Sequence, residues 1–290
     1  MRPLRWLSTV FPTQDLKSLI RFRQVSGAIL GALTAPPKHV RIVKARIGEV
    51  DGEWIFAEGA RDEPVLVFIH GGGMFFPLNN LFRKVLGNLS ALSETRVFAV
   101  DYDLPPDHVY PTAHDQCYAS YRALAEQGKR VVLIGESSGG ALALATLLRA
   151  AKAGLPQPAL CVLISPVLDF GFRDLKGWDY EAIFADPGFA IGLHQHYVAG
   201  CDLENPDLRP VDADLTGLAP IYALAGERDF TRRDVERLDE GLQRHGATLD
   251  YMLWPRAWHG WTLFGSVLPE ARDAQELLGE VIRKHVDKVD

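Results

Sequence analysis

The stretch Val131–Gly140 constrains the fold of this chain more than any other. It begins with a short apolar run, Val131–Ile134, of the kind that forms a strand covered on both faces. A Gly-x-Ser-x-Gly sequence, Gly135-Glu-Ser-Ser-Gly139, follows, and residues that favour a helix resume at Ala141. A serine between a strand and a helix sits in a tight turn, where a Cβ at either flanking glycine would collide with its neighbours. The sequence therefore predicts a strained Ser137 whose hydroxyl is held at the carboxyl edge of a sheet, beside free N–H groups of the helix.

Strands and helices alternate along the chain from Pro64 onward, which predicts right-handed crossovers and a parallel sheet. We expect strands at 65–69, 96–100, 131–135, 160–164, 221–225 and 249–253, and helices at 81–92, 114–126, 141–151, 232–245 and 270–286. Two earlier strand-like segments, 39–47 and 53–57, predict an antiparallel hairpin at a sheet edge, with its turn at Val50-Asp51-Gly52. The expected fold class is therefore α/β.

Residues 1–290 are expected to form a single domain with a helical cap. The segments of about 1–35 and about 169–206 break the strand–helix rhythm: the first reads as short amphipathic helices, and the second is rich in aromatic residues, glycine and proline. We expect both segments to form a cap over the carboxyl edge of the sheet. Their aromatic content and position give as candidate linings of a substrate pocket Trp6, Phe11, Phe22, Phe75 and Phe76.

Ser137 is unreactive unless a base takes its proton and a third group orients that base. Among nine histidines we choose His259, because it lies in a loop after the strand expected at 249–253, and such loops carry catalytic groups. The acid is expected after the preceding strand, where Asp229 is the first choice and Glu227 the second. Asp234 would already lie one turn into the next helix. Capping that helix is the alternative role for Asp229.

The run His70-Gly71-Gly72-Gly73 directly follows the strand expected at 65–69. Three glycines let backbone N–H groups turn inward without interference from a Cβ. Together with the N–H of Ser138, they would surround the oxygen that becomes negative when Ser137 attacks an acyl carbon. The run does not fit a phosphate-binding loop, because no Lys-Ser/Thr follows and the Gly-x-Gly-x-x-Gly spacing is missing. His70 itself is expected to hold the glycine loop.

Composition excludes several other classes of protein. The formal charge of −6, without a basic stripe, argues against nucleic acid as a partner, and no apolar run is long enough for stable insertion into a membrane. The three cysteines are far apart and odd in number, which suits a reducing cytoplasm. No zinc-type spacing is present; His194 and His196 alternate without a third ligand nearby, so we interpret them as a solvated or cap pair rather than a metal site.

The combined motifs resemble the hormone-sensitive-lipase-like family of α/β-hydrolases, in which serine, acid and base follow in this chain order. The segment Asp101–Pro111 is also similar to a signature of that family, although Asp103 and Pro105 depart from it, as do Glu136 and Ser138. The resemblance covers roughly Pro64 to the C-terminus. It implies an eight-stranded, mostly parallel sheet with helices on both faces under a helical cap, no cofactor, and a monomer or a homodimer paired through the 249–253 edge. The roles it implies are Ser137 as nucleophile, His259 as base, Asp229 as orienting acid, and Gly71, Gly72 and Ser138 as N–H donors.

The resemblance implies hydrolysis of small-molecule carboxylic esters with short to medium acyl chains. Cleavage of an N-acyl or formyl amide by the same residues is the alternative, because the sequence does not separate leaving groups. A non-catalytic ligand receptor is a third possibility, since plant gibberellin receptors resemble this family but have lost the catalytic histidine. The presence of His259 disfavours that interpretation.

Overall fold

The computed structural model describes residues 17, 20, 21, 23, 24, 37–173 and 187–287. Most of the first segment expected to form a cap, about 1–35, lies outside these residues, and so do residues 174–186 of the second. Within the second segment, helix α6 (Pro187–Tyr197) is described. None of the helices among the described residues combines the length and the apolar character needed to cross a bilayer.

Eight strands form one sheet, in the spatial order β1-β2-β4-β3-β5-β6-β7-β8. Only the pairings of β2 with β1 and with β4 are antiparallel; all the others are parallel, so the prediction of a mostly parallel eight-stranded sheet is confirmed. The strands are β1 (Val40–Ile47), β2 (Val50–Ala57), β3 (Arg61–Ile69), β4 (Thr95–Val100), β5 (Val131–Glu136), β6 (Leu160–Ile164), β7 (Ile221–Gly226) and β8 (Asp250–Trp254).

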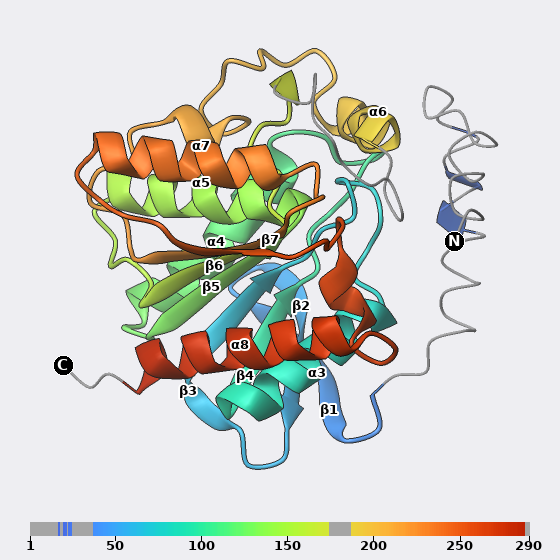
Figure 1. The fold of residues 1–290 in the computed structure, drawn as a ribbon, viewed down its shortest axis with the longest axis vertical. Coiled ribbons are helices and arrows are strands. Elements are labelled where there is room, and N and C mark those ends of the chain that lie inside the picture. The colour runs from blue at the N-terminus through green and yellow to red at the C-terminus, as the bar shows by residue number, and fades with distance from the viewer. Residues whose placement is uncertain (1–16, 18–19, 22, 25–36, 174–186, 288–290) are drawn as a thin grey trace.

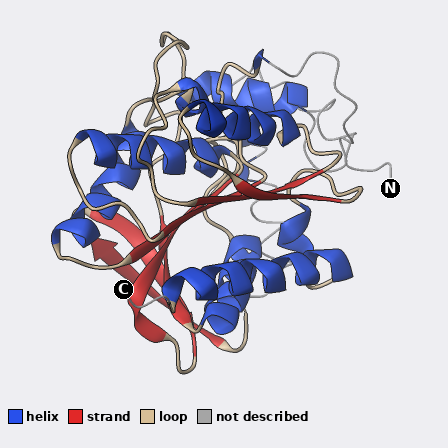
Figure 2. Ribbon diagram, turned by 60° about the vertical axis from the view of Figure 1, so that its left-hand side comes forward, coloured by secondary structure: helices blue, strands red, loops and turns tan. Residues whose placement is uncertain are grey.

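Helices cover both faces of this sheet (Figures 1 and 2). The central strands β5 and β6 are buried at every position, and alternate residues point to opposite faces, so each face needs a helical layer. One core contains Leu133 and Leu163 with residues of the first layer, and the other contains Ile134 and Val162 with residues of the second. The first layer holds α4 (Thr112–Glu126), α5 (Ser138–Lys152) and α7 (Arg232–Arg244), and the second holds α3 (Asn80–Ser93) and α8 (Pro269–Val286).

The hairpin of β1 and β2 forms as expected, but its turn was placed wrongly. Ile47 pairs with Val50, so the turn is Gly48-Glu49, and Gly48 adopts a φ of +60° that suits glycine. Gly52 instead lies inside β2, paired with Val100 of β4. A Cβ at Gly52 would collide with the ring of Phe98, so this glycine makes room for cross-strand packing rather than for a turn.

Candidate active site

Ser137 stands in the turn between β5 and α5, as the sequence predicts. Its φ of 52° and ψ of −122° are strained for a residue with a side chain. Backbone hydrogen bonds hold the turn: the N–H of Ser137 donates to the Ile164 carbonyl at 2.9 Å, and the Ser137 carbonyl accepts from Val167 at 2.9 Å. A Cβ at Gly139 would collide with the Ile69 carbonyl, and one at Gly135 with the Gly139 carbonyl. The glycines therefore allow α5 to start close against the neighbouring strands.

The structure brings Ser137, His259 and Asp229 together in one chain of hydrogen bonds. The Ser137 hydroxyl lies 3.0 Å from Nε2 of His259. On the other side of the ring, Nδ1 of His259 donates to Oδ1 of Asp229 at 2.9 Å. All three residues are buried, and the ring of Phe230 lies 4.4 Å from that of His259, centroid to centroid. This is the arrangement by which a base activates a serine while an acid fixes the orientation and tautomer of the base.

Burial and mutual attraction act in opposite directions on the pKa values of the pair. Burial raises the pKa of Asp229, but the charge of His259 and hydrogen bonds from His259 and Thr231 lower it more, so the net value lies below 3.8. Burial lowers the pKa of His259, but the charge and hydrogen bond of Asp229 raise it more, so the net value lies above 6.5. Asp229 is thus a carboxylate at neutral pH and attracts a proton toward His259.

The two loops that carry the acid and the base are tied to each other. The N–H of Arg228 donates to the Ala257 carbonyl at 3.0 Å, and a Cβ at Gly226 would collide with that same carbonyl. Asp229 also accepts a hydrogen bond from the N–H of Thr231 at 2.9 Å, so it stabilises the start of α7 as well as orienting His259.

The other two acids considered from the sequence make different contacts. Glu227 is exposed and accepts from the N–H of Arg256 at 3.0 Å. Asp234 accepts from the N–H of Leu168 at 2.7 Å. Neither carboxyl group makes a hydrogen bond to His259 among the described residues, so the geometry favours Asp229 as the orienting acid.

The glycine loop follows β3 and is held by its own histidine. Nδ1 of His70 donates to the Gly71 carbonyl at 2.7 Å, and the ring stacks on Tyr102 with centroids 4.2 Å apart. The Tyr102 hydroxyl donates to the His70 carbonyl at 2.7 Å. Burial lowers the pKa of His70 to about 4, so it is neutral at neutral pH and acts as a structural support.

The predicted N–H donors differ in what they contact. Gly71 lies against the carboxyl group of Glu136, since a Cβ there would collide with Oε2, and its N–H lowers the pKa of that group. The N–H groups of Gly72, Gly73 and Ser138 make no hydrogen bond within the part of the chain that the structure describes. Gly72 and Gly73 have φ values of 106° and 66°, which turn the backbone in a way that residues with side chains rarely adopt. Free N–H groups beside a nucleophile are the donors that an oxyanion requires.

Glu136 adds a second buried carboxyl group to the site. A Cβ at Gly71 would collide with this group, so the two residues are in close contact. Burial raises the pKa of Glu136 to about 7; the charge of Asp229 also raises it, while the charge of His259 lowers it. Glu136 therefore changes its charge near neutral pH, next to the pair that carries the proton.

The candidate pocket residues are only partly placed. Phe75 is fully buried and forms a small cluster with Leu193 of α6, against which Phe76 and Phe189 pack. Trp6, Phe11 and Phe22 lie outside the described residues. A Cβ at Gly73 would lie 2.8 Å from Leu193 Cδ1, so α6 covers the glycine loop directly.

His194 on the same helix is buried rather than solvated. Its Nδ1 donates to the Ala190 carbonyl at 2.7 Å, and burial lowers its pKa to about 4. No group of three His, Cys, Asp or Glu side chains in the described part of the chain is placed to hold a metal ion.

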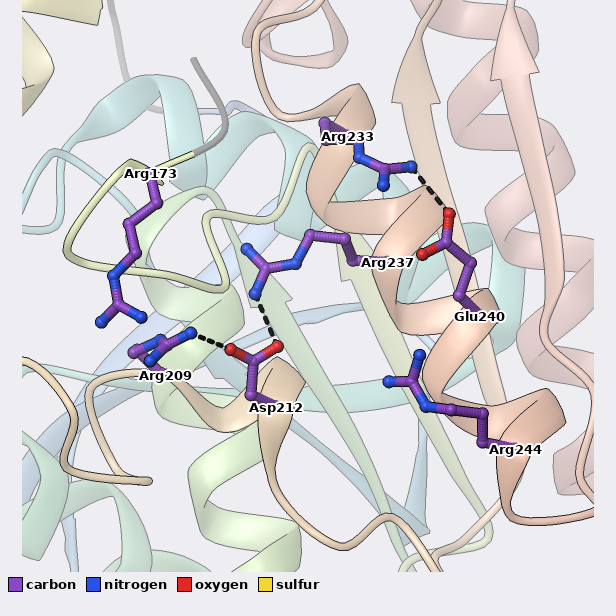
Figure 3. A pocket seen from close by; sticks show the side chains of 7 residues that line it. All are labelled: Arg173, Arg209, Asp212, Arg233, Arg237, Glu240 and Arg244. Carbon is purple, nitrogen blue, oxygen red and sulfur yellow. Dashed lines mark hydrogen bonds and ion pairs between the residues drawn. The ribbon is translucent and has the colours of Figure 1, made fainter. Parts of the chain in front are cut away.

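A pocket of about 280 Å³ lies apart from this site, on the surface of α7 and the short helix η2 (Pro210–Asp212) (Figure 3). Three of its five arginines bind the two acids that line it: Arg237 and Arg209 both bind Asp212, and Arg233 binds Glu240 at 2.8 Å. The pocket is therefore the surface of an ion-pair network that links α7 to η2, and it contains no nucleophile.

Glu136 and Ser165 belong to the site although no role is predicted for them from the sequence. Glu136 lies inside the Gly-x-Ser-x-Gly motif, and its departure from the pattern of the family was the available signal. Ser165 directly follows β6, the neighbour of the nucleophile strand, and helps to lower the pKa of Asp229. A hydroxyl at the carboxyl end of a central strand was its only signal.

Comparisons with known proteins agree with this geometry. A family described as "alpha/beta hydrolase fold" matches residues 66–263. An acetyl-hydrolase of Streptomyces hygroscopicus is 31% identical over 258 residues, 87% of this chain and 85% of that protein. An esterase of Acinetobacter venetianus is 28% identical over 81% of this chain and 79% of that one.

Solved structures give the same result. The crystal structure of an esterase from the bacterial hormone-sensitive lipase family is 28% identical, covers 92% of each chain and has a TM-score of 0.84. The esterase EstE5, soaked with p-nitrophenyl butyrate, is 28% identical, covers 91% of each chain and has a TM-score of 0.82. The chain therefore belongs to the α/β-hydrolase family, and its resemblance to the hormone-sensitive-lipase-like esterases is confirmed.

Proposed function

We propose that this protein is a serine carboxylesterase that hydrolyses small esters through an acyl-enzyme on Ser137. The observation that carries the proposal is the chain of hydrogen bonds from Ser137 through His259 to Asp229, at 3.0 and 2.9 Å. The names of the relatives, acetyl-hydrolase and esterase, support the same reaction. A receptor that only binds its ligand has no need of this complete arrangement.

The reaction proceeds in two steps, acylation of Ser137 and hydrolysis of the acyl-enzyme. His259 takes the proton of Ser137 as Oγ bonds to the ester carbonyl carbon; the tetrahedral intermediate then expels the alkoxide, which receives that proton and leaves as an alcohol. Water next attacks the acyl-enzyme, His259 takes its proton, and the carboxylic acid leaves as Oγ of Ser137 recovers a proton. Asp229 remains ionised throughout and stabilises the imidazolium form of His259.

The negative oxygen of each tetrahedral intermediate is bound by backbone N–H groups. Gly72 and Ser138 are predicted donors whose N–H groups make no hydrogen bond among the described residues, and Gly73 adds a further N–H in the same loop. Gly71, the remaining predicted donor, also lies against the carboxyl group of Glu136. One such donor contributes on the order of 10²–10³ in rate, because it is in place before the charge forms.

The substrates we propose have short to medium acyl chains. The acetyl group in the name of the Streptomyces relative and the butyrate ester soaked into EstE5 support this size range. We also propose that α6 belongs to a cap over the site, formed with the segments of about 1–35 and about 169–206, because Leu193 covers the glycine loop. The free thiols of Cys117, Cys161 and Cys201 support a cytoplasmic location, and β8 at the sheet edge is the surface we propose for a homodimer.

The test is hydrolysis of 4-nitrophenyl esters from acetate to laurate by the wild type and by Ser137→Ala. We expect the variant to lose at least roughly 10³-fold in kcat/KM, since the nucleophile is removed. Ser120→Ala is the matched control, because it removes a buried hydroxyl in α4 that has no hydrogen-bond partner among the described residues. Full activity of Ser137→Ala would refute the assignment. Turnover of 4-nitroanilides alone would favour the amide hydrolase instead.

A further inference from the structure

Among the residues that the structure describes, the hydroxyl of Ser165 and Oδ2 of Asp229 are buried polar atoms without hydrogen-bond partners. Both residues are almost completely buried, so water does not reach either atom from the surface. Ser165 follows β6 and Asp229 follows β7, and these strands are parallel neighbours, so the two residues lie at the same edge of the sheet. The Ser165 hydroxyl also lowers the pKa of Asp229. Leaving both unsatisfied is costly, and a hydroxyl rotates freely about its C–O bond.

The backbone holds Ser165 between the strand of the nucleophile and the strand of the acid. The N–H of Ser165 donates to the Leu224 carbonyl of β7 at 2.7 Å. The preceding residue, Ile164, accepts from the N–H of Ser137 at 2.9 Å. Ser165 has a φ of 45°, a conformation that residues with side chains rarely adopt. Strain of this kind persists only where the surrounding structure enforces it, and it is concentrated at functional sites.

One carboxylate oxygen of Asp229 is available to accept a hydrogen bond from this hydroxyl. Oδ1 already accepts from Nδ1 of His259 and from the N–H of Thr231, both at 2.9 Å. Oδ2 has no donor within the described part of the chain, although a buried carboxylate normally accepts hydrogen bonds at both oxygens. We propose that Ser165 is a positioning residue: its hydroxyl donates to Oδ2 of Asp229 and thereby fixes the plane in which the carboxylate meets His259. This inference rests on the proposed esterase function and deepens it.

The effect on the pH profile has a definite sign. A hydroxyl donor neutralises part of the negative charge of Asp229, so its removal leaves a carboxylate that attracts the proton of His259 more strongly. Two further ionisable groups face the pair, Glu136 from β5 and His194 from α6. Both groups are present in the wild type and in the variants, so a difference between their pH profiles is due to the Ser165 hydroxyl.

The experiment compares Ser165→Ala and Ser165→Gly with the wild type and with the control Ser120→Ala, on 4-nitrophenyl acetate. We expect kcat to fall about tenfold in both Ser165 variants with little change in KM, because the hydroxyl orients the acid without touching substrate. The acid limb of kcat/KM should move to higher pH by roughly half a unit. Glycine accepts the φ of 45° without strain, so Ser165→Gly separates the loss of the hydroxyl from strain in Ser165→Ala.

NMR titration of the His259 side chain supplies a readout that does not need turnover, and we expect its pKa to rise in both Ser165 variants. An unchanged His259 pKa in both variants would overturn the proposal. So would wild-type kcat in Ser165→Gly, since strain alone would then explain any loss in Ser165→Ala. An inactive wild type, or an active Ser137→Ala, would instead refute the esterase function, and the titration would still decide the role of Ser165.

Discussion

At the scale of single residues, the activity depends on the charge state of His259. Only the neutral ring accepts the proton of Ser137, and the net effect of burial and Asp229 is to raise the pKa of His259 above 6.5. We therefore expect kcat/KM to fall as the pH decreases through a value above 6.5, because protonation removes the base. The measurement is the pH dependence of kcat/KM for 4-nitrophenyl acetate, corrected for spontaneous hydrolysis. A plateau that extends below pH 6 would contradict the assignment of His259.

Glu136 should change the pH at which kcat/KM falls on the acid side. Its negative charge helps to raise the pKa of His259, so Glu136→Gln should move the acid limb to lower pH, opposite to the Ser165 variants. Glu227→Gln is the control, since that carboxyl group is exposed and binds Arg256 instead. If Glu136→Gln left the acid limb in place, the two groups would not interact as the structure indicates.

The same substitution should change stability in a pH-dependent way. The folded protein raises the pKa of Glu136 from 4.5 to about 7, so the folded state binds more protons and loses stability as the pH rises between these values. The loss is on the order of 3 kcal/mol, and it disappears when the group no longer ionises. We therefore expect the Tm of Glu136→Gln, relative to wild type, to be higher at pH 8 than at pH 5. Equal differences at both pH values would contradict the burial of a carboxylate.

Some residues of the site could be predicted from the sequence, and others could not. Ser137, Asp229 and His259 each stand just after a predicted strand, where chain order and residue type limit the candidates. Glu136 and Ser165 could not be chosen, because their importance depends on which neighbouring strand each side chain faces. That information appears only when β5, β6 and β7 are placed side by side.

At the scale of elements, the start of α5 depends on contact between backbones. A Cβ at Gly139 would collide with the Ile69 carbonyl of β3, and backbone at the centre of a sheet does not yield easily. Gly139→Ala should therefore reduce the free energy of unfolding by roughly 2–4 kcal/mol and displace Ser137, with a large loss of kcat. Chemical denaturation measures the first effect and ester hydrolysis the second.

Gly154, just beyond the other end of α5, is the matched control. It has a φ of 67°, and a Cβ there would meet nothing within 4 Å. Gly154→Ala should cost only the strain of the left-handed conformation, roughly 1–2 kcal/mol, and should keep kcat. Equal losses of kcat in the two variants would show that the effect is general destabilisation rather than displacement of the nucleophile.

The boundaries of most elements could also be predicted, because apolar runs and glycine mark them. Two strands begin earlier than expected, at Val50 and at Arg61, and Gly52 shows why such details could not be predicted. A glycine serves a turn by its backbone freedom and a strand by its lack of a side chain, and the sequence does not distinguish these uses. Only the ring of Phe98 on the adjacent strand reveals which one applies.

At the scale of the whole molecule, segments far apart in the chain meet around the glycine loop. Arg23 donates to the Pro105 carbonyl at 2.9 Å, and its guanidinium lies 5.0 Å from the centre of the Phe75 ring. Phe75 donates its N–H to the Gly72 carbonyl at 3.1 Å and packs on Leu193. Arg23, the glycine loop and α6 are thus linked through the buried ring of Phe75.

Arg23→Ala tests whether this linkage supports the loop or shapes the acyl pocket. The substitution removes a cation–π contact and a charged hydrogen bond, so the free energy of unfolding should fall by about 1–2 kcal/mol. Because Phe75 is fully buried, we expect kcat/KM to fall by a similar factor, roughly two- to fivefold, for every ester from acetate to laurate. Arg122→Ala, which removes a cation–π contact with Tyr118 on α4, should leave the profile unchanged. A loss confined to the long-chain esters would show instead that Phe75 contacts the acyl chain, as the sequence alone predicts.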